Sequence, residues 1–79
     1  MRVMTSPNQL KSIRESLGES QEGMARKTRS LRSRTIKNAE DGKRVTYDTA
    51  TQILETINAL LSEANRPTIT LEDLGLTLY

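Results

Sequence analysis

The sequence predicts an all-α fold, a compact bundle of four to five helices with a short leucine-rich C-terminal extension. Over residues 47–64, apolar residues recur at spacings of three and four, which is the period of a helix with one buried face. The 79 residues include no Phe and no Trp, so the core must be built from Leu, Ile, Met and Ala, which favour packed helices over a β-sandwich. A chain of this length forms one small domain.

Capping residues and chain breakers set the expected helix ends. Ser6 and Gln9 form a capping box around Pro7, which suits the first turn of a helix, and Gly18 is a good stop for that helix. By the same reasoning the later N-caps are Ser20, Thr46 and Thr70. Helices are therefore expected at 7–17, 21–28, 33–41 and 47–64, with a short helical turn at 70–74.

The chain divides into an expected flexible tail at 1–6, a helical domain at 7–66 and a C-terminal segment at 67–79. Pro67 forbids continuation of the long helix into this last segment. Within it, Leu74, Leu76 and Leu78 alternate with small or polar residues, which is a strand-like spacing. The leucines either fold over the chain's own core or form part of a twofold dimer interface, by strand pairing.

Missing residue types exclude several kinds of chemistry. Without Cys there is no disulfide, thiol nucleophile or cysteine zinc site, and without His there is no imidazole base or histidine metal cluster. No motif places a catalytic pair, and the core is too small to enclose a shaped pocket of about 300 Å³ or more. We therefore expect no enzyme, no cofactor, no metal and no small-molecule substrate. The apolar runs are short, so no membrane span or signal peptide is expected.

Positive charge is concentrated in one quarter of the chain. Residues 26–44 contain eight of the 12 lysines and arginines against only Glu40 and Asp41, which gives that segment a net charge of +6. Residues 45–79 contain one arginine against five carboxylates, a net charge of −4. Such clustering is typical of a surface that binds a polyanion, although a solvated basic face gives the same pattern.

Three stretches resemble the Cro/repressor type (XRE-like) of helix-turn-helix DNA-binding domain. They are "LKSIRESLGESQEGMARK" (Leu10–Lys27), "RTIKNAEDGKR" (Arg34–Arg44) and "YDTATQILETI" (Tyr47–Ile57). The resemblance implies a lambda-repressor-like bundle with a recognition helix at about 33–41. It also implies a sequence-specific regulator of transcription, a repressor that binds double-stranded DNA as a homodimer on a near-palindromic operator. Such a protein is cytoplasmic, and associated with the nucleoid when bound.

The resemblance assigns roles residue by residue. The base-reading positions are Ser33, Arg34, Lys37 and Asn38. The phosphate-contacting positions are Ser20, Gln21, Arg32, Lys43 and Arg44. The chemistry agrees, because Arg pairs with guanine, Asn pairs with adenine, and a helix N-terminus attracts anions. In this family Arg14 and Glu40 often form a buried ion pair between the first and third helices, and the alternative is two unrelated surface charges.

The sequence departs from the family pattern in the turn before the recognition helix. Between Ala25 and Thr35 it has one residue more than the commonest spacing, and the family's usual Gly is replaced by Arg29 or Ser30. The turn is therefore expected to be longer, which leaves the start of the recognition helix open by about one residue. Ala39 is smaller than the residue usual at its place, which predicts looser packing beneath that helix.

Other functions remain as alternatives. The main one is a protein-interaction module, such as an antitoxin or accessory factor, that uses the helix at 47–64 and the leucine-rich segment. Base-reading side chains at Arg34 and Asn38 discriminate against it. RNA binding is disfavoured because Phe and Trp, which stack on bases, are missing. Tyr47 has two interpretations: it packs the long helix on the core, or its hydroxyl reaches a phosphate.

Overall fold

The structure, a computed structural model, describes residues 8–79, and these residues form five α-helices. They are α1 (Leu10–Ser16), α2 (Gln21–Lys27), α3 (Ser33–Glu40), α4 (Tyr47–Glu63) and α5 (Leu71–Leu74). The prediction of an all-α fold with four to five helices is confirmed. Over residues 8–79, β pairing is limited to one isolated bridge between Val45 and Leu78.

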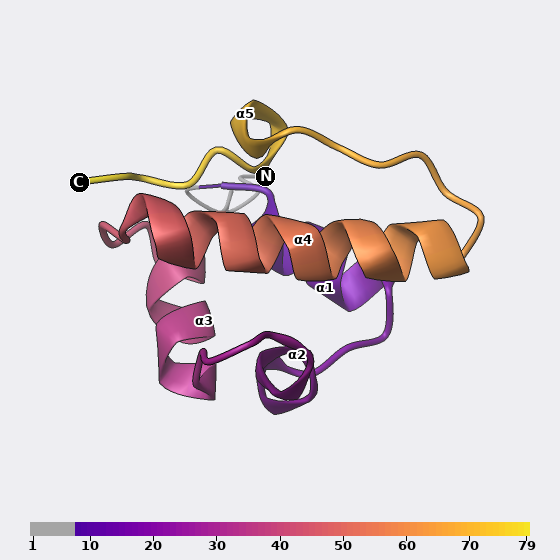
Figure 1. The fold of residues 1–79 in the computed structure, drawn as a ribbon, viewed down its shortest axis with the longest axis horizontal. Helices are drawn as coiled ribbons and strands as arrows, with labels where there is room; N and C mark the ends of the chain where they lie inside the picture. Colours follow the sequence, from indigo (N-terminus) through magenta and orange to yellow (C-terminus); the bar gives the residue numbers. More distant parts are fainter. Residues whose placement is uncertain (1–7) are drawn as a thin grey trace, which may run out of the picture.

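The long helix α4 is the axis around which the other helices pack. It spans the length of the molecule in Figure 1, with α1 behind it, α2 and α3 on one side and α5 on the other. Its inner face contributes Ala50, Ile53, Ile57 and Leu61 to a core that also takes Leu10, Met24, Ile36 and Leu74 from the four remaining helices. Burying each large apolar side chain contributes about 1.5–3 kcal/mol, so this shared core supplies most of the stability.

The first helix begins later than the sequence suggests. Residues 8 and 9 precede α1, and the N-cap Gln9 makes no side-chain capping bond, while Ser6 and Pro7 lie outside the described residues. Asn8 takes over the capping role. Its Oδ1 accepts a hydrogen bond from the Leu10 N–H (3.0 Å), and its Nδ2 donates to the Ala39 carbonyl (2.7 Å). The start of α1 is thereby fixed to the end of α3.

A buried ion pair joins α1 to α3. Arg14 Nε donates to Glu40 Oε2 (2.5 Å) and Arg14 Nη2 to Glu40 Oε1 (3.2 Å), and both side chains are less than a tenth exposed. Arg14 Nη1 donates to the Glu19 carbonyl (2.7 Å), and Gln21 Nε2 donates to Glu40 Oε1 (2.9 Å). The expected buried pair is present. It also provides hydrogen-bond partners for the Glu19 carbonyl and the Gln21 amide.

The buried ion pair stabilises the protonated form of Arg14. Its hydrogen bond to Glu40 raises the pKa of the guanidinium above an already high usual value. A raised pKa gives stability that is present at every pH below the unfolded value and is lost only as pH rises through the folded one. Arg14 therefore stays protonated over the whole working pH range.

The C-terminal segment folds over the core of its own chain. Thr70 and Asp73 form a capping box at α5, and Leu74 is fully buried. Gly75 then turns the chain with a φ of +71°, a conformation that side-chain-bearing residues rarely adopt. The Val45 N–H donates to the Thr77 carbonyl (2.9 Å), which joins the segment to the connector between α3 and α4.

This arrangement argues against the expected dimer interface formed by Leu74, Leu76 and Leu78 together. Leu74 has no exposed surface, so it is unavailable to a second chain, and Leu76 packs against the core. Leu76 remains partly exposed, and Leu78, at 37 % exposure, presents the most surface of the three leucines. The reason is that Gly75 reverses the chain and turns the alternating leucines back onto the bundle.

No described helix is both long enough and apolar enough to cross a bilayer.

Removing the Glu40 carboxylate is expected to be costly. Glu40→Ala leaves the buried Arg14 charge unpaired, and the free energy of unfolding should fall by about 3–5 kcal/mol in urea titrations. The control is Asp41→Ala, which breaks only the exposed Lys37–Asp41 pair and should cost less than about 1 kcal/mol. Equal losses in the two variants would show that the buried pair does not fix α3 on α1.

Truncating the buried leucine of α5 tests the position of the C-terminal segment. Leu74→Ala should lower the free energy of unfolding by about 2–5 kcal/mol at any protein concentration, because it leaves a cavity in the chain's own core. Leu78→Ala, at a partly exposed position, should cost clearly less. A Leu74→Ala protein that melts like wild type but associates more weakly would contradict this placement.

Candidate nucleic-acid interface

The third helix has one buried face and one open face. Ile36, Ala39 and Glu40 are buried, whereas Arg34 and Lys37 are exposed. Ser33 and Asn38, the two other residues expected to read bases, are half-buried at the borders of the open face. The helix therefore presents two pairs of polar side chains at i, i+4 spacing, Ser33 with Lys37 and Arg34 with Asn38. The four predicted base-reading residues lie on one helix surface.

The turn before α3 has five residues, 28–32, and needs no glycine. Thr28 is extended, with a φ of −83° and a ψ of 168°. Its hydroxyl donates to the Ala25 carbonyl (2.6 Å) and accepts from the Leu31 N–H (3.0 Å). Positive φ angles in residues 8–79 occur only at Gly18, Gly42, Gly75 and Asn65, all outside this turn. The longer turn is thus accommodated by an extended residue, and α3 begins at Ser33, as the sequence suggests.

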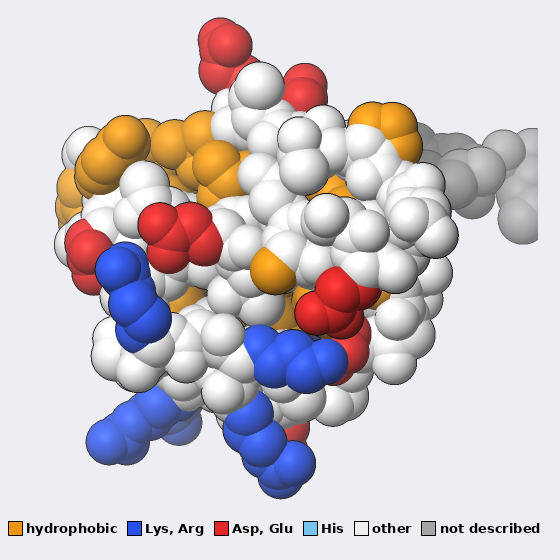
Figure 2. All heavy atoms as spheres, turned by 45° about the vertical axis from the view of Figure 1, so that its right-hand side comes forward, with side chains coloured by type: hydrophobic (Ala, Val, Ile, Leu, Met, Phe, Trp, Pro, Cys, Tyr) orange, Lys and Arg blue, Asp and Glu red, His pale blue; other side chains and the backbone are white. Residues whose placement is uncertain are grey.

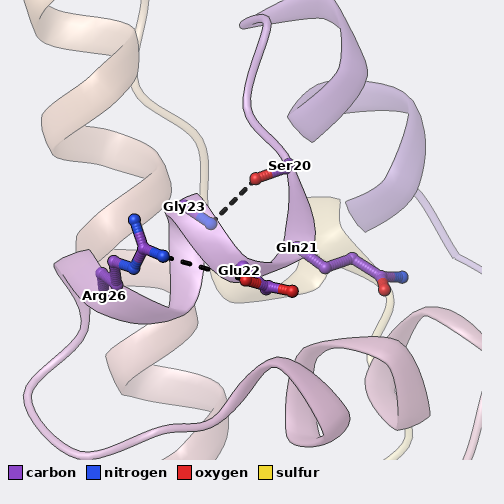
Figure 3. A pocket seen from close by; sticks show the side chains of 5 residues that line it. All are labelled: Ser20, Gln21, Glu22, Gly23 and Arg26. Carbon is purple, nitrogen blue, oxygen red and sulfur yellow. Dashed lines mark hydrogen bonds and ion pairs between the residues drawn. The ribbon is translucent and has the colours of Figure 1, made fainter.

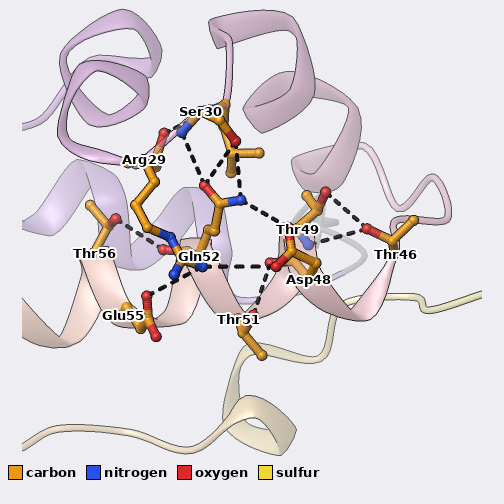
Figure 4. A network of polar contacts seen from close by, with 11 residues as sticks. Arg29, Ser30, Thr46, Asp48, Thr49, Thr51, Gln52, Glu55 and Thr56 are labelled. Carbon is orange, nitrogen blue, oxygen red and sulfur yellow. Dashed lines mark hydrogen bonds and ion pairs between the residues drawn. The ribbon is translucent and has the colours of Figure 1, made fainter.

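A buried glutamine on α4 holds this turn in place (Figure 4). The Oε1 of Gln52 accepts a hydrogen bond from the Ser30 N–H (3.1 Å), and its Nε2 donates to Asp48 Oδ2 (3.0 Å). Arg29 lies nearby, 3.8 Å from carboxylate oxygens of both Asp48 and Glu55. Sequence reasoning missed Gln52. The available signal was a polar residue directly beside Ile53, on the border of the apolar stripe.

Half of the clustered basic residues have a carboxylate within 4 Å. Nitrogen–oxygen separations are 2.5 Å for Lys27–Glu19, 3.0 Å for Lys37–Asp41 and 3.8 Å for Arg26–Glu22, and Arg29 is paired as described above. Among residues 8–79, the remaining four have no carboxylate partner. They are Arg32, Arg34, Lys43 and Arg44, and all four are exposed.

The four unpaired cations lie at both ends of α3. Arg32 and Arg34 are at its start, and Lys43 and Arg44 follow its end. In Figure 2 the visible lysine and arginine side chains lie in the lower half of the molecule, with some carboxylates among them, and Figure 1 places α2 and α3 in that half. The structure thus brings together the predicted base-reading residues and three of the five residues expected to contact phosphate.

The other two residues expected to contact phosphate are Ser20 and Gln21. At the start of α2 their side chains make hydrogen bonds within the chain. The Ser20 hydroxyl accepts the Gly23 N–H (2.9 Å), and the Gln21 amide donates to Glu40. They line an open surface depression of about 440 Å³, together with Glu22, Gly23 and Arg26 (Figure 3). A Cβ on Gly23 would lie 2.9 Å from Glu19 Oε1, so glycine leaves room for the polar groups around the cap.

One of the two interpretations of Tyr47 was that it packs α4 on the core. The structure contradicts this interpretation. The tyrosine side chain is 67 % exposed. Val45 is buried at this end of α4 instead, and the backbone of the C-terminal segment pairs with it. The N-cap Thr46 is confirmed, because its hydroxyl accepts the Thr49 N–H (3.2 Å).

No protein-family model, no curated protein and no solved structure matches this chain. What the surface around α3 does is therefore inferred from its own residues and their geometry.

Proposed function

We propose that this chain is a sequence-specific double-stranded DNA-binding regulator of transcription, a repressor that uses α3 as its recognition helix. The observation that supports it best is the surface of α3. Arg34 and Asn38 share its open face, and cations without carboxylate partners in residues 8–79 lie at both ends of the helix. A protein surface leaves such cations unpaired at an electrostatic cost that a polyanion removes.

The dimensions of the helix suit the major groove of B-DNA. An α-helix with its side chains is about 10–12 Å wide, and the major groove is about 12 Å wide. With α3 in the groove, the Arg34 guanidinium donates two hydrogen bonds to guanine O6 and N7, and the Asn38 amide pairs with adenine N6 and N7. Ser33 and Lys37 offer further donors on the same face. Side chains at i, i+4 read neighbouring base pairs.

The residues at the two ends of α3 supply affinity rather than sequence information. Arg32 before the helix, and Lys43 and Arg44 after it, bind phosphate oxygens and set the depth and angle of the helix. The start of α3 is held by the Gln52–Ser30 contact and its end by Glu40, so little conformational freedom is lost on binding.

Two copies on one near-palindromic site would place their recognition helices one DNA turn apart, about 34 Å. Occupancy of such an operator represses transcription by blocking access of the polymerase. The alternative, a protein-interaction module, has less apolar surface to use than the sequence suggests. Leu74 is buried and Leu76 packs on the core.

Two substitutions separate base reading from phosphate binding. Arg34→Ala should weaken binding to the preferred duplex by about 1–3 kcal/mol and relax the preference at one base pair, because it removes a bidentate contact. Fluorescence anisotropy measures this on DNA upstream of the protein's own gene and on duplexes selected from a random pool. Wild type should prefer the selected site over random duplex by about 10³-fold or more.

Lys43→Ala should weaken binding to every duplex alike and reduce the slope of log affinity against log salt by about one. The matched control is Arg66→Ala, which removes the same charge at the end of α4, where Arg66 bonds Ser16, and should leave DNA binding unchanged. If Arg34→Ala, Lys43→Ala and Arg66→Ala weaken binding equally, the α3 surface is not the interface.

A further inference from the structure

The large hydrophobic side chains that residues 8–79 leave exposed gather at one corner of the molecule. They are Tyr47 at 67 %, Leu78 at 37 % and Tyr79 at 83 % exposure. The Tyr79 N–H donates to the Val45 carbonyl (3.1 Å), and Tyr47 opens α4 two residues after Val45. In Figure 1 the C-terminal end lies beside the start of α4. We call these three residues the aromatic corner.

The backbone at this corner has an open edge. The Val45 bridge engages the Thr77 carbonyl and the Tyr79 N–H. The N–H and carbonyl of Leu78 lie between them, and neither has a partner among residues 8–79. An extended segment with a free edge pairs readily with another extended segment. A second copy offers the same edge, so antiparallel pairing about a twofold axis satisfies both chains at once.

The apolar area at the aromatic corner is too small to hold a dimer alone. A tyrosine side chain buries roughly 200 Å², so the exposed fractions leave about 350 Å² per copy for a partner. A pair would bury about 700 Å² in total, whereas stable specific interfaces bury about 1,200–2,000 Å². The corner therefore supports a weak contact, which forms only when something else holds two copies together.

The charges beside the corner point to what holds them together. Only residues 41–44 separate the end of α3 from Val45, and they include the unpaired Lys43 and Arg44. Two corners that meet bring these cations of both copies close, and the repulsion opposes association in free solution. DNA phosphates neutralise the same cations, and adjacent half-sites raise the effective concentration of one copy at the other to the millimolar range.

We propose that a second copy of this chain docks at the aromatic corner, and that the contact forms on DNA and not in free solution. The proposal rests on the DNA-binding function proposed above and adds to it the partner surface and the order of assembly. One consequence is a steeper response to protein concentration, because the second copy binds more tightly than the first.

The test uses the full chain and the duplex selected in the binding experiment, in two forms that carry either both half-sites or one. Sedimentation of the free protein at about 10 μM should show a monomer. On the two-site duplex, two copies should bind cooperatively, with a midpoint at least about tenfold below that on the one-site duplex. The variant Tyr79→Ala should reduce this cooperativity and leave binding to the one-site duplex unchanged.

The matched control is Thr68→Ala, an exposed substitution after the far end of α4, which should retain full cooperativity. A second variant, Tyr47→Phe, keeps the apolar ring and removes the hydroxyl. It should retain cooperativity too, and a uniform loss of affinity in it would assign the hydroxyl to a phosphate instead of the ring to a partner.

Several outcomes overturn the proposal. They are a stable dimer without DNA, independent binding to the two half-sites, or cooperativity that survives the combined replacement of Tyr47 and Tyr79 by alanine. Failure of wild type to bind any duplex removes the proposed function as well. Normal binding to one half-site without cooperativity removes only the inference about the corner.

Discussion

The ion pair between Arg14 and Glu40 is the constraint on which the rest of the structure depends. Apolar contacts are non-directional, whereas a forked guanidinium–carboxylate contact has one good geometry. Because Glu40 is the last residue of α3, the contact fixes the end of that helix to α1. The same carboxylate accepts the Gln21 amide at the start of α2, so one buried group orients three helices.

Two further buried polar side chains complete this orientation. Gln52 bonds the turn before α3, and Asn8 bonds the carbonyl of Ala39 near the end of that helix. No buried side-chain polar atom in the described residues lacks a partner. A satisfied buried network specifies one packing arrangement, while the apolar contacts around it supply the bulk of the stability. The exposed face of α3 is thus presented in a fixed orientation.

The sequence predicted local features well and long-range polar contacts poorly. Helices α2 to α5 lie within one residue of their expected ends, because caps and apolar period are local signals. The start of α1 was wrong because it depends on Asn8 and its bond to Ala39, 31 residues away. Tyr47 was counted with the apolar stripe of α4, but Val45 is buried at that end of the helix.

In the surface around α3, too, local features were predicted from the sequence and long-range contacts were not. The open face of α3 follows from its helical period, and the sequence placed Arg34 and Lys37 on it. The charge cluster was also visible, but which cations have carboxylate partners depends on Asp48 and Glu55, which are distant in sequence from Arg29. The Arg14–Glu40 pair was reached only through the resemblance to a family. The roles of these residues toward DNA stay predictions.

The two ends of the described chain meet in the finished fold. The Gln9 N–H, just before α1, donates to the carbonyl of Leu74, and the extended residues after α5 pair with the connector between α3 and α4. Contacts between residues so distant in sequence form late, because a long loop must close first. During synthesis, a chain that has not yet reached Leu74 cannot fill this part of the core. The bundle therefore completes its core only after residues 71–79 have left the ribosome.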